Sequence, residues 1–208
     1  MKSQSLLVRR RLPAQGRLQQ AEEGHRVLGI DASLSSTGYA YQAGGKLITG
    51  RITTDKLRGT HRLVYLRKQV ERVMSVCAPT LVVYEDYAMG ARGNNMFHIG
   101  ELGGVLKTLI WEKGVDLLSV PPTTMKSVIA LNGRADKPDI TKALKTRFGL
   151  SVNQHDEADA TGLMIVGEVL RGIRRITDES EGQPKRSDAI YQLNITKGQL
   201  QSISFSTS

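Results

Sequence analysis

The order of short apolar runs along the chain restricts the fold more than any other feature. The runs "RVLGID", "TGYAYQAG" and "KLITGRITT" follow one another closely, and each has the length and apolar composition typical of a strand. Gly44-Gly45 joins the second run to the third and predicts a tight hairpin turn. The three runs therefore predict an antiparallel meander.

Helices and strands alternate after this meander. Residues 61–78 repeat apolar side chains at helical spacing, and Pro79 predicts the end of that helix. "TLVVYED" and "VDLLSV" are two further strands, separated by a glycine-rich loop over 87–97 and a helix over 98–114. Three more helices are predicted over 123–131, 138–148 and 156–175. This order predicts an α/β fold with a five-stranded mixed sheet, three antiparallel strands and then parallel ones, and helices on both faces.

Charge and composition divide the chain into a middle and two ends. Its 208 residues carry a formal net charge of +9, which favours a polyanionic partner such as nucleic acid. Residues 1–24 are basic and Gln-rich and predict a flexible arm, 25–176 predict one folded domain, and 177–208 predict a polar linker and a C-terminal segment of unknown role. No apolar run is long enough to cross a membrane. The single cysteine, Cys77, lies on the apolar face of its helix, which predicts a buried free thiol.

The arm also bears on location. It lacks the apolar core of a secretory signal, and Glu22 and Glu23 argue against a mitochondrial transit peptide. We therefore expect a cytoplasmic protein, with mitochondrial import as the alternative.

Four carboxylates stand at the ends of predicted elements. Asp31 ends the first strand, Glu85 lies at the end of the fourth, and Asp156 and Asp159 open the last helix on one helix face. Acids at a helix N-terminus often serve only to cap it, and a lone Asp after a strand often forms a turn. Four acids that converge would repel one another unless a hard divalent cation bound them. The sequence thus leaves two interpretations, local capping or a shared metal site for phosphodiester hydrolysis.

Four stretches of the chain resemble the successive motifs of RuvC-type Holliday junction resolvases. They are "VLGIDASLSSTGYA", "LVVYEDYAMG", "VPPTTMKSVIALNGRADKPDITKAL" and "QHDEADATGLMI", in the family's order over roughly residues 26–175. The resemblance implies a ribonuclease H-like fold, a homodimer, two Mg²⁺ or Mn²⁺ ions per active site, and paired incisions in four-way DNA. It also implies that the metal ligands and catalytic acids are Asp31, Glu85, Asp156 and Asp159.

The resemblance further assigns basic and aromatic residues to the DNA. It implies that Lys126 and Lys137 act beside the scissile phosphate, although for a single lysine solvated surface charge is the alternative. Lys126 is predicted in a helix and Lys137 in a turn just before a proline. Further DNA contacts are expected from Tyr87, Arg92 and Arg134.

The chain departs from the family at several positions. Ala32-Ser33 replaces the Pro-Gly that usually follows the first aspartate, and the loop after Glu85 differs. In the family an aromatic residue of that loop probes the junction centre; Tyr87 and Phe97 are the candidates, and Phe97 is expected to pack in the core instead. His155 is expected to be a surface residue. These departures suggest a bacteriophage or otherwise divergent member.

Two adjacent glycines, Gly103 and Gly104, lie inside a predicted helix, where glycine is costly. They therefore predict close approach of another backbone, in a dimer or on the chain's own sheet.

Three other functions are alternatives to a Holliday junction resolvase. They are a broader debranching nuclease for forks and flaps, a DNA-binding protein without catalysis, and an actin-like ATP-binding module. A chain of this length is too short for the two domains that the last of these needs.

Overall fold

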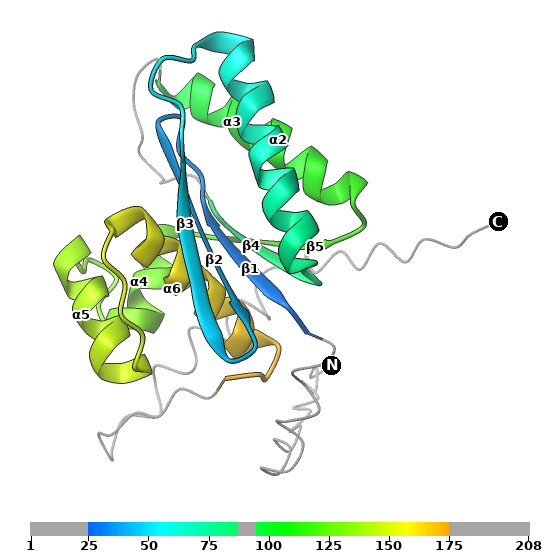
Figure 1. Ribbon diagram of the computed structural model, residues 1–208. Helices are drawn as coiled ribbons and strands as arrows, with labels where there is room; N and C mark the ends of the chain where they lie inside the picture. The colour runs from blue at the N-terminus through cyan, green and yellow to red at the C-terminus, as the bar shows by residue number, and fades with distance from the viewer. Residues whose placement is uncertain (1–24, 87–94, 175–208) are drawn as a thin grey trace, which may run out of the picture.

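The structure, a computed structural model, describes residues 25–86 and 95–174, which form one sheet between two layers of helices (Figure 1). The strands are β1 (Val27–Asp31), β2 (Ser36–Ala43), β3 (Lys46–Thr53), β4 (Leu81–Glu85) and β5 (Asp116–Val120), and they lie in the order β3-β2-β1-β4-β5. β2 is antiparallel to both β1 and β3, whereas β4 is parallel to both β1 and β5. The predicted five-stranded mixed sheet is therefore confirmed.

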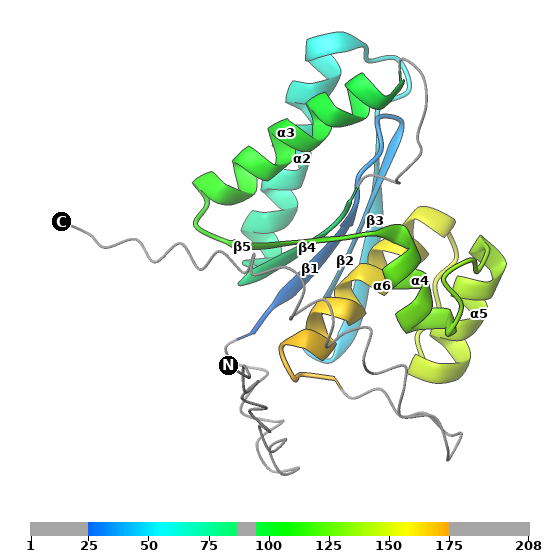
Figure 2. The same cartoon turned by 180° about the vertical axis from the view of Figure 1, so that it is seen from behind.

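The helices cover both faces of this sheet, as predicted. They are α2 (Gly59–Cys77), α3 (Asn95–Glu112), α4 (Pro122–Ala130), α5 (Lys137–Phe148) and α6 (His155–Leu170). α2 and α3 pack on one face, and α6 lies on the other with α4 and α5 outside it (Figures 1 and 2). Each face buries its own apolar cluster, because the central strands carry apolar side chains on both sides.

The two-residue period of the central strands decides where their terminal acids lie. Ile30 of β1 belongs to the cluster with α2 and α3, whereas Val83 of β4 belongs to the cluster with α6. Asp31 comes one residue after Ile30, and Glu85 two residues after Val83. Because successive side chains point to opposite faces, both carboxyl groups lie on the face that α6 covers.

α6 approaches the sheet unusually closely at two glycines. A Cβ atom on Gly29 of β1 would lie 2.0 Å from the carbonyl oxygen of Ala160, and one on Gly38 of β2 would lie 2.1 Å from that of Asp156. Any other residue at these positions would push the helix away from the sheet. The absence of side chains at Gly29 and Gly38 thus fixes the height of α6, including its first turn, above β1 and β2.

The structure corrects three expectations. The predicted loop over 87–97 is too long, because α3 already begins at Asn95. Phe97 does not pack in the core: 70% of its surface is exposed, because it lies on the side of α3 that faces away from the sheet. Lys137 does not lie in a turn but is the first residue of α5, whose start is fixed by a capping box between Asp136 and Asp139.

The structure also tests the expectations for Cys77 and for the two adjacent glycines of α3. Cys77 is buried, and burial raises the pKa of its thiol to about 11, so the thiol is uncharged and inert near neutral pH, as predicted. Gly103 is buried against the chain's own core. Gly104 is exposed, and a Cβ atom there would meet nothing within 4 Å, so no backbone of the described chain approaches it.

The predicted arm over 1–24 and the predicted segment over 177–208 lie outside the described residues. Among the residues described, none of the helices combines the length and apolarity needed to span a bilayer.

Candidate active site

Three elements bring the four predicted acids to one end of the sheet. Asp31 is the last residue of β1 and Glu85 the last residue of the neighbouring parallel strand β4. Asp156 and Asp159 lie in the first turns of α6, which crosses the same face of β1 and β2. The acids influence one another electrostatically, because Glu85, Asp159 and Asp156 all raise the pKa of Asp31. The structure thus gathers all four, and their role in catalysis stays a prediction.

Burial and mutual repulsion make full ionisation of this cluster unfavourable. Burial is the largest cause that raises the pKa of Asp31, from 3.8 to about 9, and the charge of Glu85 and a hydrogen bond between the two carboxyl groups add to it. Burial also raises the pKa of Glu85 and of Asp159. The cluster therefore holds at least one proton near neutral pH, where a bound cation would serve the same purpose.

Two lysines face the acids from α4 and α5. The charges of Lys126 and Lys137 both act on Glu85 and on Asp159 in the direction that lowers their pKa, opposing the effect of burial. The Nζ atom of Lys137 lies 3.9 Å from Oδ1 of Asp156. The structure therefore brings both predicted lysines next to the predicted acids, although Lys126 is half-buried and Lys137 exposed.

Strands β2 and β3 hold the first turn of α6 by side-chain contacts that sequence reasoning missed. Ser36 Oγ donates a hydrogen bond of 2.5 Å to Oδ2 of Asp156. Thr49 Oγ1 donates one of 2.9 Å to Glu157, and Arg51 lies 3.9 Å from the same carboxylate. No local pattern marks these residues, because hydroxyl groups near a turn are common and their partners lie more than a hundred residues further along the chain.

The other predicted site residues lie apart from the acids or outside the described chain. Arg134 is exposed in the turn between α4 and α5, where its backbone N–H donates to the side chain of Asn132. His155 is exposed at the start of α6, as expected. Tyr87 and Arg92 lie outside the described residues, so their predicted DNA contacts stay predictions.

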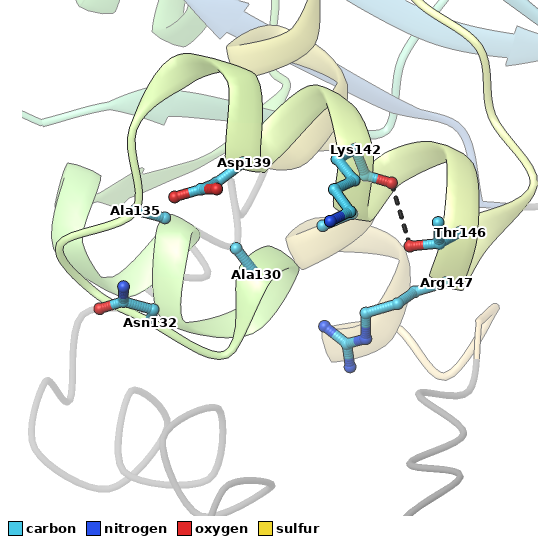
Figure 3. A pocket seen from close by; sticks show the side chains of 8 residues that line it. Ala130, Asn132, Ala135, Asp139, Lys142, Thr146 and Arg147 are labelled. Carbon is cyan, nitrogen blue, oxygen red and sulfur yellow. Dashed lines mark hydrogen bonds between the residues drawn. The ribbon is translucent and has the colours of Figure 1, made fainter.

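A shallow pocket of about 340 Å³ between α4 and α5 is separate from the acid cluster (Figure 3). Its lining includes Lys142, Thr146 and Arg147 of α5, and none of the four acids. Arg147 donates to the carbonyl oxygens of Val128 and Ile129 at the end of α4, so its guanidinium group ties the two helices together. The pocket is a consequence of this helix pairing, and we place the candidate active site at the acids.

The architecture is that of a ribonuclease H-like protein, with a five-stranded mixed sheet and helices on both faces. Solved structures with a similar fold include two from Thermus thermophilus. "Thermus thermophilus RuvC structure" aligns with a TM-score of 0.58 and 19% identity over 71% of this chain and 97% of that one. "T. thermophilus RuvC in complex with Holliday junction substrate" aligns with a TM-score of 0.59 and 20% identity over 68% and 91%.

Sequence comparison assigns the family. The family model described as "Crossover junction endodeoxyribonuclease RuvC" matches residues 27–167, and this chain belongs to that family. A curated relative of that name from Caldicellulosiruptor saccharolyticus is 33% identical over 144 residues, which cover 65% of this chain and 87% of the relative. Another from Rickettsia bellii is 28% identical over 145 residues, covering 66% and 92%.

Proposed function

We propose that this protein is a structure-selective endonuclease that resolves Holliday junctions by paired hydrolysis of phosphodiester bonds. Membership of the crossover junction endodeoxyribonuclease family supports the reaction class. The observation that carries the proposal is the convergence of four acids from β1, β4 and α6 at one end of the sheet. The helix dipole of α6 accounts for an acid in its first turn, but not for Asp31 and Glu85 at the ends of two adjacent strands.

Divalent cations fit this set of residues by their chemistry. Carboxylate oxygens are the ligands that Mg²⁺ and Mn²⁺ prefer. Burial, and after it the charges of the neighbouring acids, raise the pKa of Asp31, and a cation would relieve this repulsion. Within residues 25–86 and 95–174, no three His, Cys, Asp or Glu side chains already stand in a coordinating arrangement. Asp156 accepts a hydrogen bond from Ser36 at Oδ2 and faces Lys137 with Oδ1. We propose that Asp31, Glu85, Asp156 and Asp159 hold two such ions.

The acids and the two lysines would have different roles in hydrolysis. Bound cations would supply Lewis acidity that activates water and stabilises the leaving oxygen of the phosphodiester. The acids would hold the cations, and Lys126 and Lys137 would offer positive charge to the phosphate, which four carboxylates would otherwise repel. The capping box of α5 keeps Lys137 in place. Direct attack by water leaves a 5′-phosphate and a 3′-hydroxyl and needs no covalent intermediate.

Branched DNA is the partner that fits this chain. Its net charge of +9 favours a polyanion, and one of the solved structures with the same fold is described as a complex with Holliday junction substrate. Tyr87, Arg92 and Arg134 are the proposed further contacts. The two curated relatives come from bacteria, which supports a cytoplasmic location beside bacterial or phage DNA, rather than import into mitochondria.

A two-fold dimer would give the junction two active sites. On the exposed side of α3, Phe97 and Trp111 lie two helical turns before and after Gly104, and both are more than half exposed. If α3 paired antiparallel with its copy about Gly104, each Phe97 would meet the partner's Trp111, and the glycine would allow close approach of the two helices. We propose that this stripe of α3 is the dimer interface.

The function can be tested with purified full-length protein. Incubated with Mg²⁺ or Mn²⁺, it should cut a synthetic four-way junction at two opposed strands and leave a linear duplex uncut. Equal cutting of a fork or flap would favour the debranching nuclease, the alternative raised by the divergent sequence of the loop after Glu85. Binding without cutting in either metal would contradict the proposal and favour a DNA-binding protein.

A further inference from the structure

The hydroxyl group of Ser36 makes a short hydrogen bond to one of the four acids. Ser36 Oγ donates to Oδ2 of Asp156 at 2.5 Å, within the range of a hydroxyl bound to an ionised carboxylate. Both residues are half-buried, so water competes only in part for this bond. The bond joins the first residue of β2 to the first turn of α6 across 120 positions of the sequence.

The two oxygens of the Asp156 carboxylate have different surroundings. Oδ2 is held by Ser36, whereas Oδ1 lies 3.9 Å from the ammonium group of Lys137. That distance is too long for a hydrogen bond, and the Lys137 side chain is 55% exposed, so the ion pair is loose. Oδ1 therefore faces a cation that is easily displaced, while Oδ2 is fixed.

The position of the Ser36 hydroxyl is set by the sheet. Asp31 of β1 pairs with Gly38 of β2, and Ser36 lies two residues before Gly38, so all three face α6. Ser36 also pairs with Thr53 of β3, and the turn before it is closed by hydrogen bonds between Thr37 Oγ1 and the backbone of Ser33. The hydroxyl is thus a donor on a firmly held strand end, beside Asp31.

We infer that Ser36 is a positioning residue, which fixes Asp156 through Oδ2 and leaves Oδ1 as the oxygen offered to a divalent cation. This inference rests on the proposed function. Without the hydroxyl, the carboxylate is free to turn about its χ2 angle and to follow Lys137, and binding a cation would first have to order it. Loss of a partner that orients a metal ligand typically lowers metal affinity by roughly 10- to 100-fold.

The test compares Ser36→Thr with Ser36→Val in the full-length protein. The two side chains have nearly the same shape and both suit a strand, but only threonine keeps the hydroxyl. Ser35→Ala is the control, because Ser35 is an exposed neighbour whose hydroxyl lies 3.3 Å from that of Ser33. Mn²⁺ affinity is measured without DNA by calorimetry or water-proton relaxation, thermal melting in EDTA reports folding, and the Mg²⁺ dependence of junction cleavage is the second readout.

We expect Ser36→Val to bind Mn²⁺ roughly 10-fold or more weakly, while Ser36→Thr and Ser35→Ala stay within about 3-fold of the wild type. The half-saturating Mg²⁺ concentration for cleavage should shift in parallel. Equal affinities in the Thr and Val variants would overturn the inference and leave the proposed function intact. A wild type that binds no Mn²⁺ and cuts no junction would overturn both.

Discussion

Burial and the neighbouring acids make ionisation of the Asp31 carboxyl group unfavourable in the folded protein. It is a half-buried acid at the end of a central strand, crowded by Glu85 and by the acids of α6, and its pKa is raised to about 9. The folded protein therefore binds a proton at Asp31 that the unfolded chain releases near pH 3.8. The stability that depends on this proton is fully present below about pH 3.8 and is lost as the pH rises through about 9.

Asp31→Asn should accordingly stabilise the metal-free protein. The amide mimics the neutral carboxyl group and can still donate a hydrogen bond to Glu85. At pH 8 in EDTA we expect its melting temperature to exceed that of the wild type by at least about 2–4 °C, the shift that ~1 kcal/mol produces in a domain of this size. Melting curves between pH 5 and 9 check this. The exposed Asp55→Asn should change nothing, and a less stable Asp31→Asn would contradict the assigned pKa.

Neutralising each acid in turn should abolish most cleavage. For Asp31→Asn, Glu85→Gln, Asp156→Asn and Asp159→Asn we expect losses of more than about 100-fold in single-turnover rate, because ligand charge for the cations is lost. Junction binding should survive or tighten, since less negative charge faces the phosphates. Gel-shift and cleavage assays on the same preparations separate the two effects. Wild-type turnover in one variant would remove that residue from the metal site.

Lys126 and Lys137 should affect the rate more than the affinity. Their charges act on Glu85 and Asp159, so under the proposed function both lysines would face the scissile phosphate. Lys126→Ala or Lys137→Ala should lower the single-turnover rate by about 10-fold or more with a small change in Kd. Lys145→Ala, an exposed lysine in the last turn of α5, is the control and should affect only the salt dependence of binding. Unchanged rates in both variants would mark the two lysines as surface charge.

Among the elements, α6 carries two of the four acids, and its packing position on the sheet determines where they lie. Gly29 and Gly38 let its backbone touch β1 and β2, and Thr49 and Arg51 hold Glu157 from β3. The N-terminal end of α6 also favours nearby negative charge. A change in the height of this helix would therefore move Asp156 and Asp159 together relative to Asp31.

Gly38→Ala tests whether the acids depend on the height of α6 above the sheet. The added methyl group would meet the carbonyl oxygen of Asp156 at 2.1 Å, so the first turn of the helix must shift. We expect a loss of about 1–3 kcal/mol in the free energy of unfolding, together with a weaker response of the melting temperature to Mn²⁺. Chemical denaturation with and without Mn²⁺ measures both. An unchanged Mn²⁺ response in a destabilised variant would show that the acids do not depend on the height of α6.

For the whole molecule, the open question is how one chain of this kind cuts two strands. A four-way junction presents two equivalent strands, and a two-fold dimer presents two equivalent sites to them. The side of α3 that carries Phe97, Gly104 and Trp111 points away from the core. Substitutions at Gly104 therefore test assembly without disturbing the monomer. Substitutions at the buried Gly103 would disturb the core of the monomer as well.

Gly104→Leu should yield a folded monomer. The leucine has room in the isolated chain, where nothing lies within 4 Å, but would keep two α3 helices apart. Sedimentation velocity should show a dimer for the wild type and a monomer for the variant, which should nick junctions without paired incisions. Lys68→Leu, on the exposed side of α2, adds the same side chain elsewhere and should remain dimeric. If the wild type is monomeric both free and on a junction, the dimer proposal is wrong and the protein is a nicking enzyme.

The sequence by itself determined the order of the elements and the two acids at the ends of the central strands. The short apolar runs in "RVLGID" and "TLVVYED" predicted these strands, so Asp31 and Glu85 could be named as their terminal acids. The helical period named Asp156 and Asp159 as one pair. These predictions succeeded because each depends on residues within a few positions of one another.

Only the tertiary structure decided which side chains meet across elements. The bond from Ser36 to Asp156, the approach of Lys137, and the exposure of Phe97 and Gly104 depend on strand register and on the height of α6. Two adjacent glycines of α3 show the difference. Gly103 and Gly104 cannot be distinguished in the sequence, but in the structure Gly103 is buried and Gly104 is exposed. Such contacts join residues far apart in the chain, and local periodicity carries no information about how packed elements are rotated and spaced.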